Sequence, residues 1–312
     1  MNVAAVTMNF NEDFFLPGWI AHYSREVGLD NCFIVDHGSS DGIVRSANGA
    51  GRLLLKRSPM NDRKRTAFIG KLVEAMLYWY DAVIYSDTDE FLVADPERYK
   101  GIVDLCQSED FDALTAIGMN VVHDVDCEAP FDTCTPALLQ RRWLRPTYAL
   151  CKPILVKRPT TWRPGFHISD HQLQFSHLYL FHLHHVDITQ GLRKLMRTRT
   201  MAWEDVDPRN HQLISDEEFV GRHRSLLTLP RVEPATVCDE RILVGKFTGA
   251  AVDFVRRFPE KRNAFYADGC PNPSYMLRVP ERFRHSIPPF VNGVEILGSI
   301  PSVDTSAAGS TL

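Results

Sequence analysis

The sequence contains no cysteine pair with the spacing of a metal or redox motif. Its seven cysteines are scattered over 312 residues, at positions 32, 106, 127, 134, 151, 238 and 270, and no Cys-x-x-Cys pair occurs. An odd number of scattered thiols in a chain of this length gives no indication of a disulfide framework or a zinc ribbon. Reduced thiols fit best, so we expect a cytoplasmic protein.

Long apolar runs and a strong excess of charge are missing as well. No stretch approaches the roughly 20 apolar residues of a membrane-spanning helix. The N-terminus lacks the basic start of a signal peptide, and acidic residues follow its first apolar run closely. Membrane contact, if any, is therefore expected to be peripheral. The formal net charge of −4 gives no sign of wholesale nucleic-acid binding.

The first 90 residues alternate short apolar runs with helical patterns. Strands are predicted at 3–8, 32–35, 53–55 and 82–85, and helices at 15–28 and 61–80. Strict alternation implies right-handed crossovers and a mostly parallel sheet with helices on both faces. The sequence therefore predicts an α/β fold, with ligands at the carboxyl ends of the strands.

The pattern loosens after Pro96. Strands are predicted at 114–122, 152–156 and 178–186, and a helix at 188–203. Asp187 and Gln190 have the spacing of a capping box at the start of that helix. We divide the chain into a catalytic domain at 1–205, a C-terminal acceptor or helical region at 206–297, and a disordered tail at 298–312 that is rich in Ser, Gly and Ala.

Two acidic side chains, Asp87 and Asp89, follow directly after the strand at 82–85. Transfer of a sugar from a nucleoside diphosphate leaves extra negative charge on the leaving group. A divalent cation can neutralise that charge, and hard cations prefer carboxylate oxygens. An acidic pair after a strand is also typical of a solvated turn or a helix cap, so the pair alone leaves both interpretations open.

Three motifs in order give a more specific indication. The segment 87–92 reads Asp-Thr-Asp-Glu-Phe-Leu, and it resembles the DxDEF(L) element of a family-2-like branch of glycosyltransferases with the GT-A fold. The opening of the chain resembles the corresponding stretch of that branch through Asn11-Glu12, Trp19, His22 and the loop Asp36-His37-Gly38-Ser39-Ser40-Asp41-Gly42. His37 departs from the usual Asn. Gly165-Phe166-His167 and Leu180-Phe181-His182-Leu183 extend the resemblance over roughly residues 3–205.

The resemblance implies a nucleotide diphosphate sugar as donor, most simply a UDP-sugar, with Mn²⁺ or Mg²⁺ and a glycan or other hydroxyl acceptor. Asp36 would hydrogen-bond the nucleotide base, although an Asx-type turn is its structural alternative. The expected donor contacts are Asn11, Glu12, Asp36, Ser39, Asp41, Arg63, Lys64 and Asp87. The basic cluster at 63–65 opens a helix, where an anion is favoured, but a solvated cationic turn fits equally well.

Three histidines, His182, His184 and His185, lie within four positions of a predicted strand. Glycosyltransferases with the GT-A fold often complete the metal shell with a late histidine, so the resemblance implies Asp87, Asp89 and His182 as metal ligands. Packing in the core is the alternative. The pair 182 and 184 would suit zinc as well, but no third N or S ligand has a supporting spacing.

The resemblance also suggests a general base at the start of a late helix. Asp187 is the first candidate, with Asp170 and Asp124 as rivals, and a helix N-cap is its plain structural role. An inverting reaction rests on family analogy alone. The following helix carries the basic residues Arg193, Lys194, Arg197 and Arg199. A diphosphate or an acidic acceptor could use them, but a solvated helix face is the favoured interpretation. The alternatives to a glycosyltransferase are a sugar-phosphate nucleotidyltransferase and a nucleotide- or glycan-binding protein without turnover.

Overall fold

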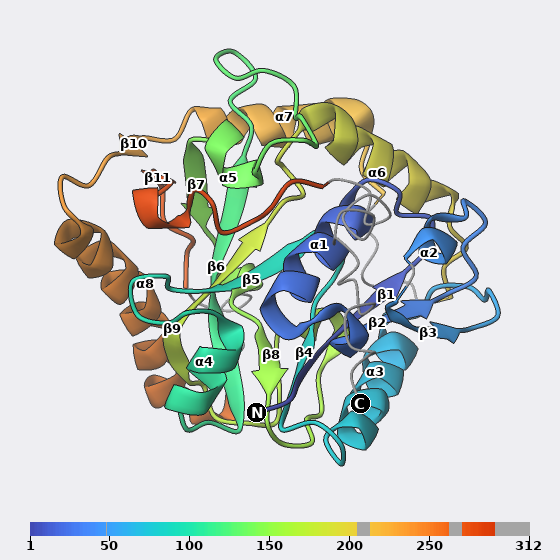
Figure 1. Ribbon diagram of the computed structural model, residues 1–312. Helices are drawn as coiled ribbons and strands as arrows, with labels where there is room; N and C mark the ends of the chain where they lie inside the picture. Colours follow the sequence, from blue (N-terminus) through green and yellow to red (C-terminus); the bar gives the residue numbers. More distant parts are fainter. Residues whose placement is uncertain (48, 205–212, 262–269, 291–312) are drawn as a thin grey trace, which may run out of the picture.

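A computed structural model describes residues 1–47, 49–204, 213–261 and 270–290 (Figure 1). A single mixed sheet runs through these ranges in the order β10-β11-β7-β6-β8-β4-β1-β2-β3, and β5 and β9 pair beside this path. The α/β class predicted from the alternation of strands and helices is confirmed.

The N-terminal half of the sheet is parallel and follows the prediction closely. β1 (Val3–Asn9) lies between β2 (Cys32–Asp36) and β4 (Ala82–Tyr85), and β3 (Gly51–Leu54) pairs with the outer side of β2. The apolar side chains of β1 and β4 are almost completely buried except for Met8. Continuous apolar runs of this kind are typical of parallel strands covered on both faces.

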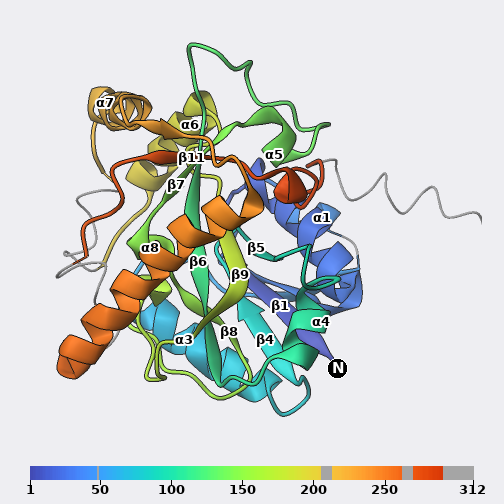
Figure 2. The same cartoon turned by 90° about the vertical axis from the view of Figure 1, so that its left-hand side faces the viewer.

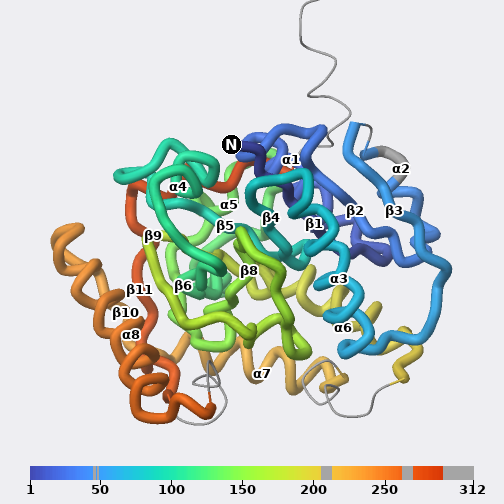
Figure 3. The backbone as a smooth tube through the Cα atoms, turned by 90° about the horizontal axis from the view of Figure 1, so that it is seen from below, coloured from blue at the N-terminus to red at the C-terminus, as the bar shows by residue number. Residues whose placement is uncertain are grey.

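Helices cover both faces of this half. α1 (Phe15–Val27) and α4 (Ile102–Ser108) lie on one side, and α3 (Asp62–Met76) lies on the other (Figure 3). Asn61 caps α3 by accepting the Lys64 N–H at 2.9 Å. The predicted end at residue 80 is wrong, because the helix stops at Met76 and Tyr78 and Trp79 are exposed beyond it.

The second half of the sheet is largely antiparallel, so strict alternation ends at β4. β8 (Pro153–Val156) runs antiparallel to β4, and β6 (Ala113–Val122) lies between β8 and β7 (Trp143–Pro146). β5 (Glu90–Ala94), which the sequence did not indicate, pairs antiparallel with β9 (Phe175–His182). This pairing sets Glu90 opposite His182 and brings the histidine beside the acidic segment.

The strand predicted at 178–186 ends at His182. The Leu183 N–H donates to the carbonyl oxygen of Asp89 at 2.8 Å, and the Val186 N–H donates to Leu183 at 3.0 Å, which turns the chain. His184 and His185 therefore lie in a turn rather than on alternating faces of a strand. The helix that follows, α6, spans Ile188–Thr200.

The remaining elements close the molecule. They are α2 (Ile43–Ser46), α5 (Ala137–Gln140), α7 (Asp216–Leu227), β10 (Arg231–Val232), α8 (Val237–Arg257) and β11 (Met276–Arg278). α8 lies along β6 and β9 (Figure 2), and its Phe247 and Phe254 share an apolar cluster with Phe91 and Phe181. The region after residue 205 thus contributes to the core of the sheet.

Two predictions concern the ends of the chain and its relation to membranes. The tail predicted at 298–312 lies outside the described residues. Within the described ranges, no helix combines the length and the apolar character that crossing a membrane requires.

Candidate active site

A cavity of about 690 Å³ lies at the carboxyl ends of β1 and β4. Ligand pockets commonly have volumes of about 300–1,000 Å³. Charged side chains of both signs line it, namely the carboxylates Glu12, Asp62, Asp87, Asp89 and Glu90 and the cations Arg57, Arg65, Lys152, Lys194 and Arg197. Five carboxylates thus face five cations. The basic side chains of such a lining can contact an anionic ligand, and its carboxylates can contact a cation that binds with that ligand.

The acidic segment forms a tight turn between two strands. β4 ends at Tyr85 and β5 begins at Glu90, and the Glu90 N–H donates to the Asp87 carbonyl oxygen at 2.9 Å. Both Asp87 and Asp89 line the cavity from this turn. The turn gives the two carboxylates the common direction that the spacing of one residue between them permits.

Asp87 is held by cations from two other elements. Its Oδ1 accepts hydrogen bonds from Arg65 Nη1 at 3.0 Å and from the Tyr85 hydroxyl at 3.1 Å, and its Oδ2 lies 3.7 Å from Lys152 Nζ. Burial alone would favour the protonated acid, but Arg65 and Lys152 outweigh it and lower the pKa of Asp87 to about 2. The same lysine pairs with Glu90 at 2.5 Å. Asp87 is therefore a carboxylate at neutral pH.

Asp89 is the most buried of the cavity's carboxylates, with 2% exposure. Its Oδ2 contacts the ammonium of Lys194, and it lies 3.3 Å from His182 Nε2 and 3.8 Å from His184 Nδ1. Burial raises the pKa of Asp89, yet the ammonium of Lys194 holds it well below its usual value. The sequence-predicted metal ligands Asp89 and His182 are therefore in direct contact.

A chain of hydrogen bonds fixes which nitrogen of His182 carries the proton. The Thr147 hydroxyl donates to the Arg145 carbonyl oxygen at 3.1 Å and accepts from Asn120 Nδ2 at 3.1 Å. The Asn120 amide oxygen is thereby turned to His182 Nδ1, at 2.8 Å, and accepts its N–H. In the neutral imidazole the lone pair is then on Nε2 and points toward Asp89.

This arrangement fits a divalent cation. An imidazole lone pair and a carboxylate oxygen 3.3 Å apart are both acceptors, so a cation between them is favourable. Carboxylate and water oxygens suit Mn²⁺, and imidazole is a common ligand of first-row transition metals. No three His, Cys, Asp or Glu side chains of the described ranges form a ready metal cage. Asp89 and His182 would hold the cation, Asp87 lies beside them, and substrate phosphates and water would supply the other ligands.

The residues predicted to contact the donor divide into two groups. Glu12 lines the cavity, as Asp87 does, and Glu12 Oε1 pairs with Arg197 Nη1 at 3.2 Å. Asn11 instead shapes the neighbouring loop. It donates its N–H to the Ser39 hydroxyl at 3.1 Å, and its side-chain oxygen accepts the Asp41 N–H at 3.3 Å. Asn11, Ser39 and Asp41 thus form a loop next to the cavity and do not line it.

Asp36, the predicted base-binding residue, is buried beside the cavity. Its Oδ2 pairs with Arg52 at 2.8 Å, and its Oδ1 accepts the Ser39 N–H at 2.8 Å, which is the turn bond that the sequence left as an alternative. His37 lines the cavity in its place. Asp36 could approach a base only if the Arg52 pair opened.

Two further cavity residues, Phe10 and Arg57, were not identified from the sequence. The Arg57 guanidinium lies 3.7 Å from the centre of the Phe10 ring, and Arg57 Nη1 donates to His37 Nδ1 at 3.0 Å. His37 is the residue at which the loop departs from the glycosyltransferase pattern. That departure was the one feature of the sequence that could have pointed to this part of the cavity. The three side chains thus form one group of contacts in the cavity lining.

The basic cluster that opens α3 contributes one member to the site. Arg65 reaches Asp87, whereas Lys64 pairs with Glu204 at 2.7 Å on the surface. Arg63 does not line the cavity. The helical turn directs these consecutive residues to different sides, which the sequence alone did not resolve.

The predicted general bases lie outside the cavity. Asp187 is 4% exposed and caps α6, because its Oδ1 accepts the N–H groups of Thr189 and Gln190 at 2.9 and 3.1 Å. Its Oδ2 accepts the Phe131 N–H at 2.9 Å. The predicted N-cap is confirmed. The reciprocal half of the capping box is absent, since the Gln190 side-chain oxygen has no hydrogen-bond partner.

The two rival bases have partners of their own. Asp124 pairs with Arg231 at 2.7 Å, and Asp170 Oδ1 accepts the Thr161 N–H at 3.0 Å. A catalytic role for Asp187, Asp170 or Asp124 stays a prediction.

α6 places two cations in the cavity, although the sequence favoured a solvated helix face. Lys194 reaches Asp89 and Arg197 reaches Glu12. Arg193 and Arg199 do follow the surface interpretation, since they pair with Asp13 and Asp216. The solvated-face interpretation is therefore wrong for one side of the helix.

The third histidine of the cluster faces away from the site. His185 stacks on Phe219, and its Nδ1 lies 3.3 Å from His223 Nδ1. Burial lowers the pKa of His185 well below its ordinary value. His184, in contrast, stacks on His182 with ring centres 5.6 Å apart and stays beside Asp89.

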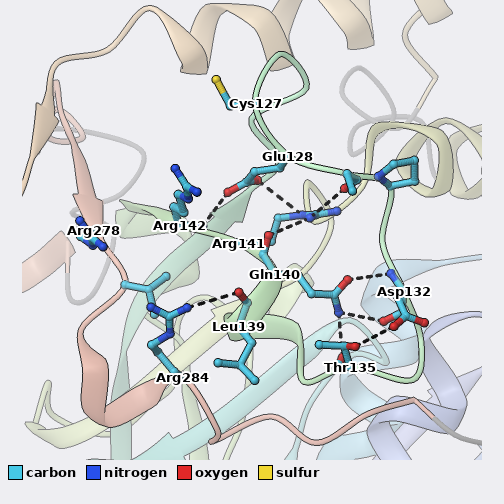
Figure 4. A pocket seen from close by; sticks show the side chains of 13 residues that line it. Cys127, Glu128, Asp132, Thr135, Leu139, Gln140, Arg141, Arg142, Arg278 and Arg284 are labelled. Atoms are coloured by element: carbon cyan, nitrogen blue, oxygen red, sulfur yellow. Dashed lines mark hydrogen bonds and ion pairs between the residues drawn. The ribbon is translucent and has the colours of Figure 1, made fainter.

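A second cavity, of about 580 Å³, shares no lining residue with the first (Figure 4). The arginines Arg141, Arg142, Arg278 and Arg284 line it. Buried Arg141 donates through Nε to the Val186 carbonyl oxygen at 2.5 Å, and its Nη2 lies 3.8 Å from Asp187 Oδ2. Arg141 thus ties this region to the start of α6.

No protein-family model matches the chain, and no curated protein matches it either. Solved structures similar to it include S. aureus TarS in complex with UDP-GlcNAc, at 11% identity over 84% of this chain and 82% of that one, with a TM-score of 0.36. Another is the mannose-1-phosphate geranyltransferase of Thermus thermophilus, at 11% identity over 71% and 68% of the chains, with a TM-score of 0.30. A cytidylyltransferase from Leptospira borgpetersenii is similar over 37% of this chain and 54% of that one, at 15% identity and a TM-score of 0.24.

Nothing about activity follows from likenesses of this size. The function has to be inferred from the residues of the site.

Proposed function

We propose that the protein is a glycosyltransferase that takes a sugar from a nucleoside diphosphate donor, in the presence of a divalent cation, and passes it to a hydroxyl acceptor. The observation that carries this proposal is the contact between Asp89 Oδ2 and His182 Nε2, 3.3 Å apart, at the carboxyl end of a parallel strand. Ligands of open α/β sheets bind at this edge.

The charges of the cavity suit a diphosphate. Arg65 and Lys152 pair with Asp87 and Glu90, and Lys194 and Arg197 of α6 pair with Asp89 and Glu12. When bound, a divalent cation would neutralise the charge that develops on the leaving diphosphate. Lys194 and Arg197 would contact the phosphate oxygens, because charge-assisted hydrogen bonds to phosphate are strong.

Phe10, Arg57 and His37 of the cavity lining could bind the nucleoside. The Arg57 guanidinium lies over the Phe10 ring, and Arg57 also donates to a ring nitrogen of His37. Aromatic and guanidinium planes stack on bases without strong sequence preference, so this surface accepts a base and leaves its identity open. UDP is the nucleotide that the resemblance favours. An inverting course and transfer of a hexose remain part of the proposal.

The direct test is nucleotide release across a panel of nucleotide sugars, with and without Mn²⁺. We expect nucleotide to be released from at least one donor, at a rate that falls when EDTA removes the cation. If the protein binds UDP and Mn²⁺ but releases nucleotide from no donor, the site is a binding site without turnover. Release that does not change with EDTA would exclude the role of the cation.

A further inference from the structure

Lys194 contacts the carboxylate oxygen that also faces His182. Its ammonium lies on Asp89 Oδ2, and His182 Nε2 lies 3.3 Å from the same atom. The ammonium is thus on the oxygen that a cation bridging Asp89 and His182 would need. One carboxylate oxygen cannot bind the Lys194 ammonium and a divalent cation at full strength at the same time.

The position of Lys194 is fixed by the way α6 begins. Asp187 caps the helix, and Gly191 packs against the preceding turn so closely that an added Cβ would lie 3.0 Å from the His184 carbonyl oxygen. The Lys194 ammonium also lies 5.3 Å from the centre of the Phe15 ring. The helix therefore delivers this lysine to the site, whereas its long unbranched side chain leaves the ammonium free to move.

We propose that Lys194 is a displaceable counter-ion, which competes with the divalent cation for Asp89 and contacts the diphosphate once the cation has taken its place. This inference rests on the proposed function for the identity of the diphosphate, but the competition itself does not. In this scheme the cation binds weakly without a nucleotide. The diphosphate favours loading, because it offers both phosphate oxygens to the cation and a new partner to Lys194.

The test is Mn²⁺ binding in the absence of nucleotide, measured by electron paramagnetic resonance of the free ion. Lys194→Met should bind Mn²⁺ about tenfold more tightly than the wild type, because it removes a charge-assisted hydrogen bond from Asp89. Arg193→Met is the matched control. It removes one positive charge from the neighbouring position of α6, where the side chain is exposed and paired with Asp13, and it should leave the affinity near that of the wild type.

Equal Mn²⁺ affinities of Lys194→Met and Arg193→Met would overturn the inference, and so would a lower affinity in Lys194→Met. If Lys194→Met does not fold, Lys194→Gln keeps a hydrogen-bond donor for Asp89 without the charge and should still bind Mn²⁺ more tightly than the wild type, by a smaller factor. The measurement uses no nucleotide sugar. A chain that releases nucleotide from no donor would therefore fail as a glycosyltransferase while the competition for Asp89 could still be observed.

Discussion

His182 Nε2 lies 3.3 Å from Asp89 Oδ2, and the other nitrogen of the same ring donates to Asn120. The first residue ends β9 and the second precedes β5, so the antiparallel pairing of these two strands creates the contact. The sequence separates the two residues by nearly a hundred positions. The fold therefore brings together a carboxylate and an imidazole that neither segment contains alone.

Asn120 should control the affinity for the cation through the tautomer of His182. Asn120→Ala removes the acceptor of the Nδ1 N–H, and we expect the Mn²⁺ affinity to fall about 10- to 100-fold, as for other residues that orient metal-binding histidines. Asn120→Asp keeps an acceptor oxygen and should retain most of the affinity. Calorimetric titration with Mn²⁺ in the presence of UDP measures both. A normal affinity in the Ala variant would mean that Asn120 does not orient the ligand.

Binding of UDP should depend on the cation. A ligand at 100 times its dissociation constant stabilises the folded state by about 2.7 kcal/mol. For a chain of this size the melting temperature would rise by a few degrees. Differential scanning fluorimetry should show this rise with UDP and Mn²⁺ together and a much smaller one with UDP alone. Identical shifts with and without Mn²⁺ would place the nucleotide away from Asp89.

Asp187→Asn separates a structural role from a catalytic one. Both carboxylate oxygens of Asp187 accept backbone N–H groups. In the Asn variant the side-chain NH₂ group would therefore face either the Phe131 N–H or the N–H groups at the start of α6. We expect the variant to lose about 1–2 kcal/mol of stability. If Asp187 is also a general base, the folded variant should in addition turn over at a rate about 10² to 10⁴ lower. Chemical denaturation and donor turnover, measured side by side, distinguish the two.

Stability should fall with acid partly through His22. This ring is buried, donates through Nε2 to the Leu92 carbonyl oxygen at 2.7 Å, and has a pKa lowered by burial to about 4. The unfolded state takes up the proton first, near pH 6.5. The contribution of neutral His22 to the free energy of unfolding is therefore complete above pH 6.5 and is lost as the pH falls toward 4.

From pH 7 to pH 5 we expect a loss of about 2 kcal/mol from His22. His22→Gln can keep a donor for Leu92 but cannot take up a proton. Urea denaturation at both pH values should therefore show a smaller loss in the variant. Some loss remains, because His185 and His223 are shifted in the same direction. An equal loss in both proteins would assign the acid sensitivity to other groups.

The sequence predicted the parallel half of the sheet well, because continuous apolar runs and helical periodicity are local signals. It located β1, β2 and β4 to within a residue or two, and it located the acidic turn at the end of β4. β5 went unrecognised because it begins with Glu90, an acidic residue whose burial depends on Lys152. That pairing is a long-range contact and leaves no local pattern.

The same limit applied to the site. The motif identified Asp87, Asp89 and His182, but the cations that surround them come from α3, from the segment before β8, and from α6. Neither spacing nor periodicity relates Lys194 to Asp89. Asp36 illustrates the converse case: the motif identified the residue, and its orientation was decided by Arg52 on the adjacent strand β3.

The most direct test of the proposed site is donor turnover by the double variant Asp87→Asn/Asp89→Asn. Asn keeps the volume of each side chain and removes the charge that would hold a cation. It also leaves Lys194 and Arg65 without their carboxylates, so some loss of stability is expected, and the assay is run at a temperature at which circular dichroism shows a folded protein. Asp13→Asn, an exposed acidic residue outside the cavity lining, is the control.

Nucleotide release from the best donor, measured with saturating Mn²⁺, gives the answer. We predict that the control retains the wild-type rate and that the folded double variant loses at least about a hundredfold, the scale of lost electrostatic stabilisation of a leaving group. A folded double variant that releases nucleotide at a rate close to the wild type would contradict the assignment of the reaction to this cavity.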